Sequence, residues 1–128
     1  MPQYLILLHD DPTQWPKLSP QEMQNVMLRY RAWGQKAEQQ KFKLAGAKLA
    51  DEPGRVMRRG KDKIRITDGP FIETKELLGG YYLIEAANYE QAVELCKDHP
   101  HLDYGTIEIR ELDPRTAEDV GRAGAQAS

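Results

Sequence analysis

The sequence lacks three features that would define its class at once: a cysteine framework, a long apolar run and a large net charge. One cysteine, Cys96, excludes a disulfide within the chain and is typical of a reducing compartment. The longest apolar run, residues 4–8, falls far short of the ~18 residues of a membrane span. The first residues also lack the basic and small-residue features of a secretory signal. We therefore expect a cytoplasmic protein with no membrane partner.

The charge balance excludes a generally cationic protein. Eighteen basic and 20 acidic side chains give a formal charge of −2, which argues against a nucleic-acid binder. One stretch, residues 55–65, is an exception, with six Lys and Arg residues and one Asp. It has no aromatic side chains on which bases could stack. A solvated hairpin with edge-protecting charges is the commoner structure, and an acidic protein surface is the alternative partner.

A chain of 128 residues is long enough for one domain that needs no metal or disulfide for stability. The apolar patterns predict strands over residues 3–8, 42–49, 81–86 and 106–112, with a hairpin from 55–59 and 63–67. Helices begin at Pro20 and after Asn88. Without the hairpin the order is βαββαβ, which predicts a ferredoxin-like α+β sandwich. Because both helices would cover one sheet face, we expect a second copy on the other face, giving a homodimer.

Local signals specify several of these elements. Ser19, Pro20 and Glu22 form a capping box with proline at the first helical position, and Asn88 with Gln91 repeats the cap at the second helix. In the hairpin, Ile64 and Ile66 alternate with polar residues, which predicts one buried face. Three more side chains are expected to pack on the buried helix stripes: Tyr30, Trp33 and Cys96. Gly46, inside the strand at 42–49, indicates a bulge or a close backbone approach.

Residues 66–86 are the most informative segment. They contain Asp68-Gly69-Pro70-Phe71, then Glu73-Thr74-Lys75-Glu76, and then Gly79-Gly80-Tyr81 at the start of a strand. This block closely resembles the signature of the YCII-related, or DGPF, family. The resemblance extends loosely over residues 3–112. It implies a dimeric α+β barrel and a domain over residues 1–112, followed by a polar tail at 113–128 that we expect to be mobile.

The resemblance also implies functions. Similar proteins are small, cytosolic and bacterial, and some are linked to extracytoplasmic-function sigma factors. Distant members act on small aromatic substrates through a histidine–aspartate pair whose histidine lies on the first helix. This chain has no histidine between Ser19 and Leu49, so it departs from that pattern.

The DGPF segment has two interpretations. Asp68, Gly69 and Pro70 fit a tight turn with a structural role. The same segment is dense in ionisable groups, which could line a cleft. In that case Asp68 is the candidate proton acceptor and Lys75 stabilises an anion. The candidate ligand-binding residues are Trp15, Glu73, Lys75, Glu76 and Tyr81.

Histidines give the remaining candidates. His9, beside Asp10 at a strand end, is the candidate catalytic histidine that would replace the missing helical one, the alternative being an exposed loop residue. His99 and His101 flank Pro100, and we interpret them as residues at a helix C-terminus rather than metal ligands. We expect no metal and no cofactor.

Two functions follow. The first is a homodimer with a small-molecule pocket and lyase- or dehydratase-like acid–base chemistry. The second is a non-enzymatic regulatory or interaction module, linked to a sigma-factor system. The sequence leaves open whether the protein is an enzyme.

Overall fold

A computed structural model describes residues 1–11, 17–68 and 77–115. In chain order the elements are β1 (Gln3–Asp10), α1 (Pro20–Gln39), β2 (Lys43–Lys48), β3 (Arg55–Arg59), β4 (Ile64–Asp68), β5 (Leu77–Glu85), α2 (Tyr89–Cys96), the 3₁₀ helix η2 (Pro100–Asp103) and β6 (Gly105–Glu111). None of the helices in these ranges has the length and apolar character needed to cross a membrane. The sequence expectation for residues 116–128 of the tail lies outside the described residues.

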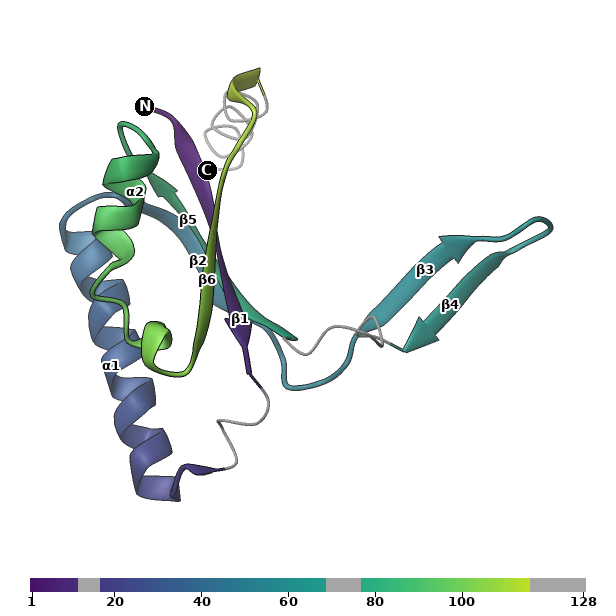
Figure 1. Ribbon diagram of the computed structural model, residues 1–128, viewed down its shortest axis with the longest axis horizontal. Helices are drawn as coiled ribbons and strands as arrows, with labels where there is room; N and C mark the ends of the chain where they lie inside the picture. Colours follow the sequence, from purple (N-terminus) through teal and green to yellow (C-terminus); the bar gives the residue numbers. More distant parts are fainter. Residues whose placement is uncertain (12–16, 69–76, 116–128) are drawn as a thin grey trace.

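Four strands form the main sheet. They are antiparallel and lie in the order β2-β5-β1-β6. Figure 1 shows α1 and α2 together on one face of this sheet, while β3 and β4 pair with each other and extend away from it. Without β3 and β4 the order is βαββαβ, so the predicted ferredoxin-like α+β fold is confirmed.

Both helices begin where the sequence predicts. The Ser19 hydroxyl accepts the Glu22 N–H at 3.1 Å, and the Glu22 carboxylate accepts the Ser19 N–H at 3.4 Å. The Asn88 side chain accepts the Gln91 N–H at 2.8 Å. These side chains satisfy N–H groups that have no partner within the first turn of a helix, which is why they set the helix starts.

The core lies between the helices and the sheet. Alternate residues of β1 point into it, together with side chains from both helices. Its buried members are Tyr4, Ile6, Leu8, Trp33, Ala37, Phe42, Ile84, Ala86, Ala92 and Cys96. Burial raises the pKa of the Cys96 thiol to about 11, so this cysteine is a packing residue, as predicted.

β1 is longer than the sequence predicts. The prediction ended the strand at Leu8, but β1 continues through Asp10, which pairs with Leu77 of β5 and with Gly105 of β6. β5 correspondingly begins at Leu77 rather than Tyr81. Pairing on both sides of a central strand outweighs the local turn preference of the aspartates.

The sheet face opposite the helices has no cover in the described chain; we call it the outer face. Strand register defines its centre: Leu5 lies opposite Leu83, and Leu7 lies opposite Tyr81. All four are half-buried. Ala45 and Ala47 of β2 extend this apolar centre, and Glu108 and Arg110 of β6 lie at its margin.

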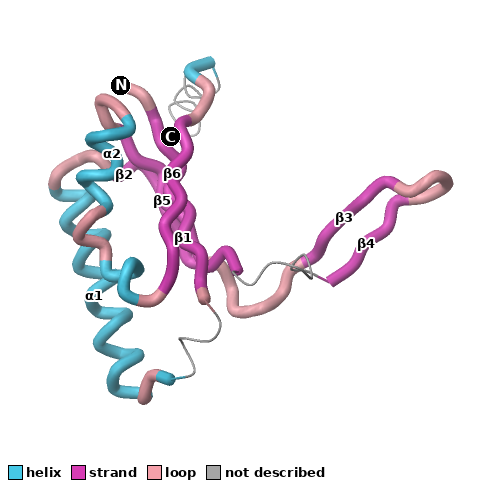
Figure 2. Tube along the Cα trace, in the orientation of Figure 1, coloured by secondary structure: helices cyan, strands magenta, loops and turns pink. Residues whose placement is uncertain are grey.

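β3 and β4 form a two-stranded arm, residues 55–68. Figure 2 shows the arm extended away from the main sheet. The predicted buried face of this hairpin is wrong for the single chain, because Ile64 and Ile66 are 45% and 62% exposed. The alternation itself is correct, but no part of the described chain packs against it.

Candidate functional site

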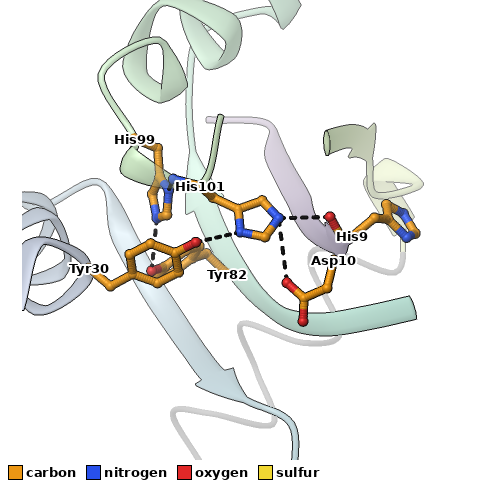
Figure 3. Close-up of polar contacts among 6 residues, drawn as sticks. All are labelled: His9, Asp10, Tyr30, Tyr82, His99 and His101. Carbon is orange, nitrogen blue, oxygen red and sulfur yellow. Dashed lines mark hydrogen bonds and ion pairs between the residues drawn. The ribbon is translucent and has the colours of Figure 1, made fainter. Parts of the chain in front are cut away.

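Polar side chains from four elements converge near the last residue of β1. Figure 3 shows them: Asp10 from β1, Tyr30 from α1, Tyr82 from β5, and His99 and His101 from the start of η2. His99 and His101 are 3% and 1% exposed and are the buried polar residues of the described core. A buried polar group is costly unless it is hydrogen-bonded, so the partners of each ring nitrogen define the site.

η2 holds the two histidines in place. His99 is its N-cap, and Pro100 follows at the first helical position. The main-chain N–H of His101 donates to Nδ1 of His99 at 2.9 Å. Nε2 of His99 therefore carries the ring proton and donates to the Tyr82 hydroxyl at 3.1 Å. The Trp33 ring packs edge-on against the His99 ring, with the centroids 4.6 Å apart.

His101 joins three elements. Its Nε2 lies 2.8 Å from the carbonyl oxygen of His9, and a carbonyl can only accept, so Nε2 carries the proton. Nδ1 is then the acceptor, and the Tyr30 hydroxyl donates to it at 2.6 Å. The carboxylate of Asp10 lies 3.8 Å from Nε2, on the same side of the ring as the carbonyl. The result is a hydrogen-bonded chain from phenol through imidazole to carbonyl, with the Asp10 carboxylate beside its Nε2 end.

Two glycines make room for this chain. Leu8 pairs with Gly80 and His9 with Leu78, so Gly79 is the extra residue of a β-bulge in β5. A Cβ at Gly79 would overlap the Asp10 carboxylate, and one at Gly105 would overlap the His9 carbonyl oxygen and crowd His101. Bulges commonly redirect a side chain next to a functional site. Here the bulge leaves the space that the Asp10 carboxylate occupies.

Burial sets the protonation of the groups around the histidines. It lowers the pKa of His99 to about 4, with a smaller contribution from His101. It also raises the pKa of Tyr82 to about 12 and raises that of Tyr30 above its usual range. Both tyrosines therefore remain phenols and His99 remains neutral at ordinary pH. The Asp10 side chain is 30% exposed, so a dissolved molecule can reach its carboxylate, whereas the rings of His99 and His101 are buried.

The residues predicted from the sequence lie elsewhere. His9 points to the outer face, and its Nε2 lies 2.9 Å from Oε1 of Glu108. Tyr81 is on the same face, opposite Leu7. Asp68 ends β4, with its 79%-exposed carboxylate 3.4 Å from Arg55. The structure does not bring His9 and Asp68 together, because they lie in different sheets. Trp15, Glu73, Lys75 and Glu76 lie outside the described residues.

The sequence analysis did not select Asp10, Tyr30 or His101 as a group. Tyr30 and His101 are 71 residues apart, and His101 and His9 are 92 apart. The available signal was weak: two of the three histidines in the chain flank Pro100, just before a strand. His99 and His101 follow α2, as expected, but they are buried through contacts with α1, β1 and β5 that the helix-end interpretation did not include.

The described residues offer no group of three or more side chains suited to a metal ion. Each ring nitrogen of His99 and His101 faces a protein partner instead. A separate groove of about 480 Å³ lies at the opposite end of β1, where Gln3, Glu85 and Glu111 contribute to its walls. It is remote from the Asp10 end of the strand, so it does not contain the histidine cluster.

A family model places the chain in one family, and similar proteins are known. The sequence model of the YCII-related domain matches residues 2–115. An uncharacterized protein of Rhizobium meliloti (strain 1021) is 29% identical over 112 residues, which covers 85% of this chain and 90% of that protein. Among solved structures, the 5-chloro-2-hydroxyhydroquinone dehydrochlorinase TftG of Burkholderia phenoliruptrix AC1100, in complex with 2,5-dihydroxybenzoquinone, aligns with 13% identity and a TM-score of 0.47. The alignment covers 87% of this chain and 93% of that one. This structural similarity is too low to support an argument about activity.

Proposed function

Because this chain belongs to the YCII-related domain family, we propose that it is a homodimer with a small-molecule site at Asp10, His101 and Tyr30. Residues 1–112 form the functional domain. The chemistry is acid–base, of the lyase or dehydratase type, and the substrate is a small hydroxylated compound. This proposal keeps the acid–base chemistry expected from the sequence and assigns it to different residues.

The observation that carries the proposal is the Asp10 carboxylate beside the hydrogen-bonded chain of Tyr30, His101 and the His9 carbonyl. In an elimination, a base accepts a proton from carbon while the C–H electron pair forms the double bond and hydroxide leaves, taking up a proton to become water. Asp10 is the candidate base because its carboxylate is partly exposed and lies 3.8 Å from the Nε2–H of His101. His101, which is buried, is a positioning residue, and so is Tyr30, which fixes the ring of His101 from the other side.

The uncovered outer face supports the homodimer. Its apolar centre of Leu5, Leu7, Tyr81 and Leu83 lies on the two central strands, where a globular fold ordinarily places a second layer. A second copy supplies this layer with the same surface, as a two-fold dimer requires.

A proton-exchange assay tests the site. A panel of small 3-hydroxy acids is incubated with the protein in D₂O, and mass spectrometry follows deuterium uptake and loss of water. For a compound that reacts, Asp10→Asn should lower the rate by about 100-fold or more, the range of general-base catalysis. Tyr30→Phe should lower it less and change the pH profile, as a positioning role requires.

Two control variants separate this proposal from the sequence-based assignment. His9→Gln and Asp68→Asn remove the earlier candidates, both from surfaces away from the His101 cluster, and should leave the rate within about twofold of wild type. Full activity in Asp10→Asn, with loss in His9→Gln or Asp68→Asn, would overturn the proposed site in favour of the first assignment. No reaction with any compound, together with stable capture of a sigma-factor system component, would favour the interaction module.

A further inference from the structure

The arm, residues 55–68, has an apolar face that nothing in the described chain covers. Register places Met57 opposite Ile66, and Arg59 opposite Ile64, on the same face of the arm. Met57, Ile64 and Ile66 are 63%, 45% and 62% exposed. An isolated two-stranded hairpin is marginally stable in water, and apolar side chains gathered on one face gain stability when they are covered. The arm therefore requires a partner surface.

The same chain offers a surface of matching character. The outer face presents Leu5, Leu7, Tyr81 and Leu83 at its centre, with no cover in the described chain. Figure 1 shows the arm leaving the molecule away from the helices and extending well clear of its own sheet. A second copy can therefore meet the arm without the arm folding back on its own body.

The combination of apolar and charged side chains on the arm favours a second copy over a nucleic acid as its partner. The arm carries six Lys and Arg residues and two Asp residues, but its exposed apolar face is of no use on a phosphate backbone. The margin of the outer face carries Glu108 beside Leu7 and Arg110 beside Leu5. An arm laid across this face would place apolar side chains on the apolar centre and could bring Arg59 toward the Glu108 margin.

We propose that the arm of one copy packs its Met57, Ile64 and Ile66 face on the outer face of a second copy, and that the exchange is reciprocal. This inference rests on the proposed homodimer and adds the segment that completes it. In a two-fold dimer each chain gives one arm and receives one, so both uncovered apolar surfaces are buried by the same contact.

Two neighbouring residues give a matched test. Ile66→Glu and Thr67→Glu introduce the same carboxylate at adjacent positions of β4, on opposite faces of the arm. Both side chains are exposed in the single chain, so neither substitution disturbs the fold of one copy. Sedimentation equilibrium should show a dimer dissociation constant raised about tenfold or more by Ile66→Glu, and changed less than about twofold by Thr67→Glu.

Leu83→Glu on the outer face separates the arm from the dimer itself. If Leu83→Glu gives monomers while Ile66→Glu dimerises like wild type, the arm proposal is wrong and the homodimer stands. If wild type is a monomer, both proposals fail. Equal weakening by Ile66→Glu and Thr67→Glu would contradict the apolar contact, because only charge would then matter.

Hydrogen exchange supplies a second readout. Amide protons of β3 and β4 should be protected at concentrations that favour the dimer and should exchange rapidly on dilution. An arm that stays unprotected in the dimer and gains protection only on addition of a single-stranded RNA oligonucleotide would overturn the proposal in favour of a nucleic-acid partner.

Discussion

At the scale of single residues, the main feature is the pair of buried histidines, His99 and His101. Burying an imidazole is unfavourable unless both nitrogens find partners, and His99 and His101 find four partners between them. Two of these partners are main-chain groups, which fix the tautomers without any charge. The pair therefore stabilises η2, and the Nε2–H of His101 is held on the His9 carbonyl, beside the Asp10 carboxylate.

This arrangement predicts a loss of stability in acid. The pKa of His99 is about 4 in the folded state, against 6.5 as its ordinary value, so the unfolded chain binds the proton first as the pH falls. The stability that His99 contributes is complete above about pH 6.5 and is lost as the pH falls toward 4. Between pH 7 and pH 4.5 the free energy of unfolding should fall by roughly 2 kcal/mol from this residue.

The measurement is urea unfolding at both pH values. His99→Asn keeps a side-chain acceptor at the N-cap but removes the imidazole that binds the proton. The fall in its free energy of unfolding between the two pH values should therefore be smaller than that of wild type by roughly 2 kcal/mol. His9→Asn is the control, since His9 is a partly exposed residue of the outer face. An unchanged pH dependence in His99→Asn would show that His99 is not the responsible group.

At the scale of elements, the β-bulge in β5 connects the sheet to the site. Gly79 is the extra residue, and its missing side chain leaves the volume that the Asp10 carboxylate fills. The sequence analysis interpreted Gly79 and Gly80 as part of a family signature at the start of a strand. The structure gives Gly79 a steric reason that depends on a residue of β1.

Gly79→Ala should destabilise the protein by about 1–3 kcal/mol, the range for forcing a group into an occupied space. In an Asp10→Ala background the same change should cost less than about 1 kcal/mol, because the obstructing carboxylate is gone. Urea unfolding of the four proteins gives this comparison. Gly34→Ala is the control, since a Cβ there makes an ordinary 3.7 Å contact with Lys43. Equal costs in both backgrounds would contradict the steric account.

At the scale of the whole molecule, the main feature is a sheet with one face covered by the helices and one face that none of the described residues covers. The helices bury Ile6 and Ile84 completely, while Leu5 and Leu83 on the opposite face remain half-buried. The arm adds a second unpartnered surface to the same chain. A protein with two such surfaces is expected to associate, and association links its thermal stability to concentration.

Dilution tests this link directly. Between 100 and 1 µM the melting temperature of wild type should fall by several degrees, because the folded dimer is lost by mass action. Leu83→Glu should melt lower, and at a temperature that does not depend on concentration. Val93→Glu is the matched control, since Val93 is an exposed residue of α2 and should retain the dependence. A concentration-independent melting temperature for wild type would argue for a monomer.

The order of the elements, the helix starts and the family could all be predicted from the sequence alone. These depend on interactions between residues close in the chain, such as Ser19 with Glu22 and Asn88 with Gln91, or on a continuous motif. Trp33 and Cys96 were likewise identified correctly as core residues from helical spacing. Local patterns were sufficient here because the physical partners lie within one turn or on one helix face.

The candidate site became visible only in the folded structure. The Asp10, Tyr30 and His101 cluster depends on pairings across 71 and 91 residues, between strand, helix and η2. Asp10 is the end of a central strand rather than part of a turn, because strand pairing outweighed its local preference. The alternating hairpin is exposed, because none of the described residues packs against its apolar face. Burial and long-range contact are properties of the folded chain, and a sequence pattern indicates only the face of an element, not what meets it.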